Sequence, residues 1–228
     1  RYTIESEYLG AKEQRLAISF DYTGKRAETR CKNTLENYLD LKSEMTGRYR
    51  KIAENAPVFN SPYPYLDKFM AMAPLFAESL RVKEYPGAVR SKTTYYWVWG
   101  WDGITSNYST IYGGNLSLIK DQLDLYMIYS DEKQGIVHAY SRDMSIGSVS
   151  AIPAQGMYIA LLHAYFANGG DIRPYYEFSK KIFGLICSKE TAPYGFCEGT
   201  SLFPDFPADL RETGHDLSGF NNTIFYCA

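Results

Sequence analysis

A succession of apolar segments with the length and spacing of helices runs from residue 60 to the end of the chain. This pattern restricts the fold to a mainly α architecture. Separate helices are predicted over 65–76, 115–130, 155–167, 173–188 and 217–228. The first is apolar around most of its circumference, which predicts a buried helix that begins near Asn60-Ser61-Pro62 and kinks at Pro74. The intervening loops alternate in length, so long functional loops are expected on one side of a helical array.

The first 57 residues differ from the rest of the chain in their pattern of polar and apolar residues. Residues 1–22 alternate polar and apolar positions in two stretches, which predicts two strands. Two strands do not form a stable sheet alone, so they are interpreted as the end of an N-terminal β domain. Residues 23–57 carry many Lys, Arg and Glu around a rough apolar stripe and are predicted to form a long linker helix. Residues 58–228 then form the helical domain.

Charge and residue spacing argue against several classes of protein. The chain has 24 Lys and Arg against 26 Asp and Glu, a net charge of −2, whereas a nucleic-acid-binding protein usually has a basic face. No apolar run approaches the roughly 20 residues that span a bilayer. The four cysteines lack the spacing of a zinc site, so no metal site is predicted. They are interpreted as free buried thiols, with a Cys187–Cys197 disulfide as the alternative.

Neither end of the sequence has the features of a natural terminus. The chain begins at Arg1 without a signal peptide and ends in an apolar run, 224–228, that no helix stop signal follows. The chain is therefore expected to be a fragment of a longer protein.

Aromatic residues make up 16% of the chain, and three of them form the most distinctive motif. Trp97, Trp99 and Trp101 occupy alternate positions directly before Asp102, and alternation in an extended segment places side chains on one face. Indole rings beside a carboxylate suit a sugar, which offers apolar C–H faces and hydroxyl edges. The alternative is a short buried strand with Trp as core filler. An aspartate buried there would still need a partner or a ligand.

A second acidic segment follows near the end of the chain. Asp205 lies between two prolines and two phenylalanines, and such apolar confinement raises a carboxyl pKa, as a general acid requires. A turn aspartate that caps the next helix is the alternative. Asp209 is a better cap, and Glu212 completes a capping box with it. His215 and Asp216 form either a hydrogen-bonded pair at a site or an ordinary helix start.

Two further histidines lie outside these segments. His138 follows Gly135 at the start of a predicted loop and is a candidate ligand contact, with a structural histidine as the alternative. His163 lies inside an apolar run and is predicted to be in the core.

Together these segments resemble the six-hairpin, (α/α)6-toroid glycosidases, especially the glucosidase and trehalase relatives in glycoside hydrolase family 63. The resemblance rests on residues 97–102, 135–138, 167–171 and 202–207, and on His215-Asp216. These resemble, in order, an aromatic loop with an aspartate after the first toroid helix, a Gly-to-His turn between the next two helices, a helix junction, and the region of the general acid. The chain departs from the family where Phe203-Pro204 precedes the acid in place of a Gly-Leu-Asp sequence, and where Ala208 replaces an arginine.

The resemblance implies an inverting glycoside hydrolase in which Asp205 is the general acid and no cofactor is required. The chain would hold the end of a β domain, a linker helix and the first part of the toroid, with the general base outside it. Trp99, Trp101 and Asp102 would bind the sugar of the −1 subsite. The full set expected to contact the carbohydrate is Trp97, Trp99, Trp101, Asp102, His138, Glu212, His215 and Asp216.

Two other functions remain open at this point. A toroid can house a carbohydrate phosphorylase or lyase, and Arg142 and Arg211 are the only cations near the predicted loops that would hold phosphate. A toroid that kept Asp102 without its base would be a non-catalytic glycan-binding protein. The sugar, the linkage and the compartment are left open, and export is favoured because enzymes that degrade polysaccharides are commonly exported.

Overall fold

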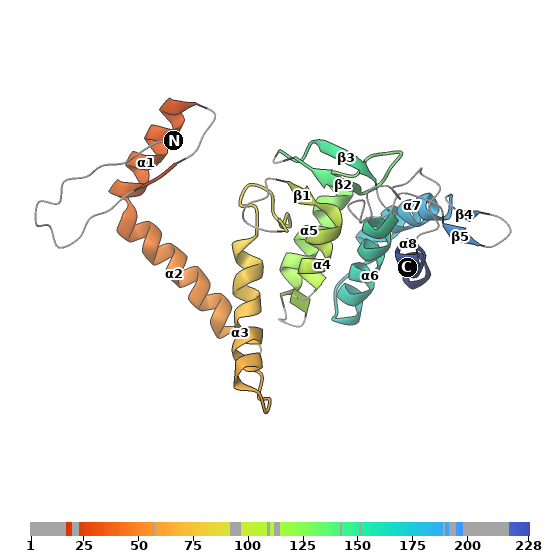
Figure 1. Cartoon of the computed structure of the whole chain (residues 1–228), viewed down its shortest axis with the longest axis horizontal. Coiled ribbons are helices and arrows are strands. Elements are labelled where there is room, and N and C mark those ends of the chain that lie inside the picture. Colours follow the sequence, from red (N-terminus) through yellow and green to blue (C-terminus); the bar gives the residue numbers. More distant parts are fainter. Residues whose placement is uncertain are drawn as a thin grey trace, which may run out of the picture. The chain divides into compact units, whose positions relative to one another are not determined.

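The computed structural model describes residues 17–19, 23–56, 58–91, 97–108, 110–111, 115–141, 143–150, 152–188, 190–191, 195–197 and 219–228. The described part is mainly helical, as the sequence predicts (Figure 1). It divides into two compact units, Arg1–Glu54 and Asn55–Ala228. The strands predicted over residues 1–22 lie almost entirely outside the described residues.

The first unit contains two helices, α1 (Gly24–Glu36) and α2 (Tyr38–Glu54), where the sequence predicts one. Thr23 caps α1, because its hydroxyl accepts a hydrogen bond from the Arg26 N–H at 3.4 Å. The helices separate at Asn37, whose backbone leaves helical geometry while its N–H and side-chain amide both donate to the Asn33 carbonyl. All residues of α1 and α2 are at least partly exposed, in keeping with their charged sequence.

The second unit begins with α3 (Pro64–Ser79). The helix starts two residues later than predicted, with Pro64 in its first turn and with the Asp67 carboxylate accepting from the Ser61 N–H at 3.0 Å. The prediction that this helix is buried is wrong, since Tyr65 is 72% and Phe69 63% exposed. Pro74 lies within the helix, which continues on both sides of it.

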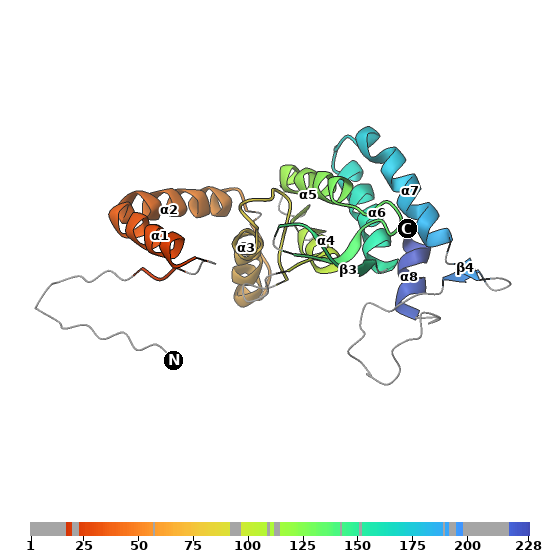
Figure 2. The ribbon, with the colours of Figure 1, turned by 90° about the horizontal axis from the view of Figure 1, so that it is seen from above.

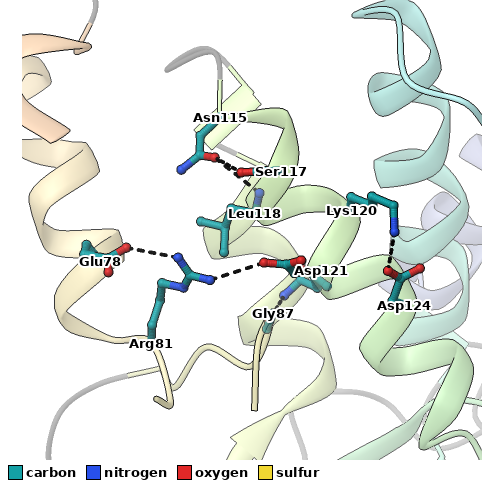
Figure 3. Close-up of polar contacts among 10 residues, drawn as sticks. Glu78, Arg81, Gly87, Asn115, Ser117, Leu118, Lys120, Asp121 and Asp124 are labelled. Atoms are coloured by element: carbon teal, nitrogen blue, oxygen red, sulfur yellow. Dashed lines mark hydrogen bonds and ion pairs between the residues drawn. The ribbon is translucent and has the colours of Figure 1, made fainter. Parts of the chain in front are cut away.

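A polar connection joins the end of α3 to α5 (Leu116–Ile128), as Figure 3 shows. The Arg81 guanidinium lies 3.3 Å from the buried Glu78 carboxylate and 3.5 Å from that of Asp121. Gly87 adopts a φ of +85°, and a Cβ there would overlap the backbone of Asp121. Only glycine meets both conditions without strain. The Gly87 carbonyl also accepts from the Gln122 amide at 3.4 Å, so this loop is held against α5.

The remaining helices form a layered array. They are α4 (Gly100–Tyr108), α5, α6 (Ile152–Ala167), α7 (Tyr176–Cys187) and α8 (Gly219–Cys227), with a 3₁₀ turn, η2 (Arg173–Tyr175), before α7. Alternate helices pack side by side, α4 on α6 and α6 on α8. α5 and α7 also pack on α6, and Figure 2 shows them on one side of the row of α4, α6 and α8. The helices predicted over 115–130, 155–167, 173–188 and 217–228 are thereby confirmed.

Most sides of α6 are buried because four helices contact it. Leu161, Leu162, Ala164 and Tyr165 are all buried. His163, predicted in the core, is exposed instead, because it lies on the remaining outer side of the helix. In the described part of the chain, no helix is long and apolar enough to cross a membrane.

Tyrosine supplies much of the core. Among the described residues, the fully buried tyrosines are Tyr126, Tyr140, Tyr158 and Tyr175. A buried hydroxyl needs a partner, and the Tyr158 hydroxyl donates to the Leu123 carbonyl at 3.2 Å. The Tyr175 hydroxyl donates to the Asp124 carboxylate at 2.7 Å. These bonds tie α6 and η2 to α5.

Two small sheets complete the unit. The first is antiparallel with the order β1 (Val98–Trp99), β2 (Val137–Tyr140) and β3 (Ile146–Ser150). The second pairs β4 (Glu190–Thr191) with β5 (Phe196–Cys197). The Asn222 amide accepts from the Cys197 N–H at 2.7 Å and donates to its carbonyl, which anchors α8 to β5. His138, predicted at the start of a loop, lies in β2 instead, because β1 and β3 pair with that segment on both sides.

Replacing Asn107 with leucine is expected to stabilise the protein by about 1–3 kcal/mol. Asn107 is fully buried in α4, and both polar atoms of its amide lack hydrogen-bond partners among the described residues. Leucine has a similarly branched side chain and removes the cost of burying these polar atoms. Urea denaturation measures the change. Asn115→Leu is the control and should be destabilising, because the Asn115 side chain caps α5 by accepting from the Leu118 N–H. A loss of stability in Asn107→Leu would show that its amide is hydrogen-bonded in solution.

Candidate functional site

The candidate site lies where β1 ends, α4 begins and β2 pairs with β1. Val98 faces Tyr140 and Trp99 faces Ala139 in the β1–β2 register. Gly100 then starts α4, and a Cβ there would lie 2.6 Å from the Val137 carbonyl oxygen. Glycine therefore allows α4 to start in direct contact with β2, which places the first turn of the helix beside that strand.

Two indoles and an imidazole gather at this junction. The Trp99 and His138 rings are 4.9 Å apart between centroids and meet edge to face at 76°. The Trp97 and Trp99 rings are 6.2 Å apart at 30°. The Trp97 side chain is 38% exposed, so part of the cluster is open to a ligand. Rings at these distances form a continuous aromatic surface.

Trp101 does not continue the extended alternation. The segment is extended only through Trp99, and Trp101 lies in the first turn of α4. The prediction that alternation alone places three indoles on one face is therefore wrong for Trp101. The α4 helix also bonds internally at this point, with the Thr105 hydroxyl donating to the Trp101 carbonyl at 2.7 Å.

Asp102 supplies the negative charge of the site. It lies in the first turn of α4, where the helix dipole favours an anion. Partial burial raises the pKa of the Asp102 carboxyl above its ordinary value of 3.8, while a backbone hydrogen bond and the charge of His138 oppose the rise. Asp102 therefore lies close enough to His138 for an electrostatic interaction, and His138 in turn packs against Trp99.

Gln155 supports the segment that leads to His138, and the sequence analysis missed it. The Gln155 carbonyl accepts from the buried Ile136 N–H at 3.0 Å, and its amide donates to the carbonyls of Gln134, at 3.1 Å, and Ile136. Gly135 has a φ of +71°, and a Cβ there would lie 2.6 Å from the Gln155 side-chain oxygen. A lone glutamine inside the apolar α6 sequence is the signal that indicates such a role.

Tyr126 was also missed by the sequence analysis. It lies fully buried beneath the site, and its hydroxyl is 3.5 Å from the Trp99 carbonyl oxygen. Burial raises the pKa of Tyr126 well above its ordinary value, and the charges of Tyr140 and Asp102 add to this rise. Tyr126 therefore stays neutral and acts as a hydrogen-bond donor at the junction of β1 and α4.

The structure thus brings together four of the predicted site residues, Trp97, Trp99, Asp102 and His138, from two separate segments. The predicted acid Asp205 and its neighbours Glu212, His215 and Asp216 lie outside the described residues, as do Arg142 and Arg211. Their predicted roles stay predictions.

Neither a metal-ligand cluster nor a disulfide is found among the described residues. Within them, no group of three or more His, Cys, Asp or Glu side chains is arranged to hold a metal ion. All four cysteines are free thiols, including Cys187 and Cys197, so the structure holds no bond between these two. The prediction that all four are buried is wrong, since Cys31 and Cys187 are partly exposed and Cys227 is exposed. Cys197 is fully buried, and burial raises the pKa of its thiol to about 11.

Replacing Asp102 with asparagine is expected to stabilise the fold at neutral pH while weakening ligand binding by about tenfold or more. The pKa of Asp102 is higher in the folded than in the unfolded chain, so folding favours the protonated form. Wild-type stability therefore falls as the pH rises from about 3 towards neutrality, and the variant lacks this contribution. Chemical denaturation of both proteins across this range measures the difference. A gap between them that does not widen with pH would contradict the assignment.

Comparisons with protein families, with curated proteins and with solved structures found no match to this chain. Its function is therefore inferred from the chemistry of the aromatic cluster, Asp102 and His138.

Proposed function

We propose that this chain belongs to a glycoside hydrolase and binds its carbohydrate at Trp97, Trp99, Asp102 and His138. The main support for the proposal is the contact between Trp99 and His138. Their ring centroids lie 4.9 Å apart although the two residues come from separate segments. Asp102, which interacts electrostatically with His138, completes the group.

These side chains match the chemistry of a sugar ring. The indoles of Trp97 and Trp99 offer apolar faces on which the C–H face of a pyranose can stack. The Asp102 carboxylate accepts hydrogen bonds from hydroxyl groups, and His138 donates or accepts them. A mostly apolar surface with a few well-placed polar groups is typical of a small-molecule site.

The arrangement of helices supports an (α/α)6 toroid as the fold. Such a toroid has an inner and an outer ring, because consecutive helices alternate between two layers. In this chain α4, α6 and α8 pack in one row, while α5 and α7 pack against α6 from one side of that row (Figure 2). These helices would form about half of the two rings, with the β1–β2–β3 sheet at one end of the inner row.

The proposed reaction is hydrolysis with inversion. Asp205 donates its proton to the glycosidic oxygen as the bond from that oxygen to the anomeric carbon breaks. A second carboxylate takes a proton from a water molecule, whose oxygen bonds to the anomeric carbon from the opposite face. The two carboxyl groups are expected to lie roughly 6.5–9.5 Å apart, which leaves room for the water. Asp102 holds the sugar hydroxyls and takes no part in proton transfer.

A screen of disaccharides with the full-length protein tests the proposal. Maltose, trehalose and cellobiose cover α and β linkages, and proton NMR identifies the anomer released first. Inversion predicts that the sugar cleaved at its anomeric carbon appears first as the β anomer from maltose and as the α anomer from cellobiose. From trehalose, in which both anomeric carbons are α, inversion predicts equal amounts of α- and β-glucose. Retention of configuration at the cleaved anomeric carbon would contradict the mechanism, and no release from any of the three disaccharides would contradict hydrolysis.

A glycan-binding protein without catalytic activity is the second candidate. It is favoured by one observation, the interaction of Asp102 with His138 at the aromatic cluster, because a single carboxylate is enough to bind sugar hydroxyl groups whereas hydrolysis needs two. Calorimetry with the same disaccharides separates the two functions. Heat of binding without released product would support the second candidate.

A further inference from the structure

The indole of Trp97 packs directly on a glycine of the neighbouring sheet. A Cβ built on Gly147, in β3, would overlap Cζ3 of Trp97 and would lie 2.8 Å from both Cε3 and Cη2. Real Cβ atoms do not approach other atoms so closely. The six-membered ring of Trp97 therefore occupies the space that any other residue at position 147 would fill.

Backbone geometry does not explain the glycine. Gly87, Gly135, Gly169 and Gly195 have a positive φ, a conformation that favours glycine, but Gly147 does not. The φ of Gly147 is not one that favours glycine, and the three heavy atoms nearest to a Cβ at this position all belong to the Trp97 indole, so we attribute the requirement for glycine to that contact. Gly147 therefore differs from these four glycines, whose positive φ by itself favours glycine.

The contact links Trp97 to the whole sheet. Trp97 directly precedes β1, and β2 lies between β1 and β3 in the sheet. The indole therefore reaches from the β1 side to β3, while Trp99 contacts His138 of β2. The two indoles, 6.2 Å apart, thus depend on all three strands for their positions.

We propose that Gly147 is a positioning residue, which lets Trp97 lie against β3 beside Trp99 and so sets the aromatic surface that holds a pyranose ring. This inference rests on the proposed function. A methyl group at position 147 would push the indole away from β3, and the sugar would lose a stacking partner.

Calorimetric titration of Gly147→Ala with maltose, trehalose and cellobiose tests the inference. We expect binding of the preferred disaccharide about tenfold weaker than in the wild type, with a shift in tryptophan emission as the indole moves. Gly184→Ala is the matched control, because a Cβ on Gly184 meets nothing within 4 Å. It should keep wild-type affinity and emission.

A double-mutant cycle with Trp97→Phe shows whether the effect acts through the indole. Phenylalanine lacks the fused ring whose atoms the new Cβ would meet, so adding Gly147→Ala to Trp97→Phe should change affinity by less than about twofold. If Gly147→Ala alone does not fold, the double variant should fold again. A double variant that remains unfolded would overturn the inference.

The possible failures are distinguishable. If the wild type binds none of the three sugars, the proposed function fails and this inference fails with it. If the wild type binds and Gly147→Ala binds equally well, only the inference about Gly147 is wrong. An equal loss of affinity in the wild-type and Trp97→Phe backgrounds would also overturn it.

Discussion

Replacing Asp205 with asparagine is expected to lower the turnover of a disaccharide by about 10²–10⁴-fold, with little loss of stability. In the sequence two prolines and two phenylalanines flank Asp205, and we expect them to confine its carboxyl in apolar surroundings, where loss of hydration disfavours the charged form. The side chain would then stay protonated near neutral pH and could donate its proton to the leaving oxygen. Asparagine keeps the shape of the side chain and removes the acidic proton. Steady-state kinetics of the full-length protein measure the loss.

A glycosyl fluoride serves as the control substrate for Asp205→Asn. Fluoride leaves with less help from an acid, so the variant should lose less activity on this substrate than on the disaccharide. Near-normal hydrolysis of the disaccharide by the variant would refute the role of Asp205, and Asp216 or Asp209 would be the next candidate. A variant that does not fold would indicate that Asp205 caps a helix.

Replacing Gln155 with leucine is expected to destabilise the fold by about 3 kcal/mol. Ile136 is fully buried, and leucine would remove the partners of both its N–H and its carbonyl. Each unpaired buried group costs about 1–3 kcal/mol. Because the same segment continues into His138, affinity for the sugar should fall as well. Denaturation in guanidinium chloride measures the first effect and calorimetry the second.

Gln122→Leu is the matched control for Gln155→Leu. Both glutamines are buried, but Gln122 makes one long hydrogen bond, to the Gly87 carbonyl at 3.4 Å, and its side-chain oxygen has no partner among the described residues. Its loss should therefore cost less, about 1 kcal/mol. Equal losses in the two variants would show that the bonds of Gln155 to the 134–136 segment contribute nothing specific.

The positions of most helices could be read from the sequence, because their signals are local. The Asn115 cap directly precedes the apolar run of α5, and its side chain accepts from the Leu118 N–H at 3.2 Å. The apolar run of α6 likewise marks a helix before any partner is known. The break at Asn37 was not predicted, since charged residues continue on both sides of it and no glycine or proline marks the junction.

Burial could not be read in the same way. The apolar sequence of α3 predicts a buried helix, yet Tyr65 and Phe69 are exposed, because burial depends on what packs against a helix. The tyrosines show the opposite case. Tyr158 and Tyr175 can lie in the core because their hydroxyl groups donate hydrogen bonds to the Leu123 carbonyl and the Asp124 carboxylate. These partners lie far away in the sequence.

The residue types of the candidate site were evident from the sequence, since indoles beside a carboxylate form a contiguous motif at 97–102. Their arrangement was decided by the tertiary structure. Gly100 starts α4 and removes Trp101 from the extended segment, while pairing of Trp99 with Ala139 brings His138 to the indole. Gln155 in α6 accepts a hydrogen bond from the Ile136 N–H, and Gly147 in β3 lies against the Trp97 indole. The physical reason is that helix signals lie within a few residues of one another, whereas strand register, packing and desolvation arise only between distant segments.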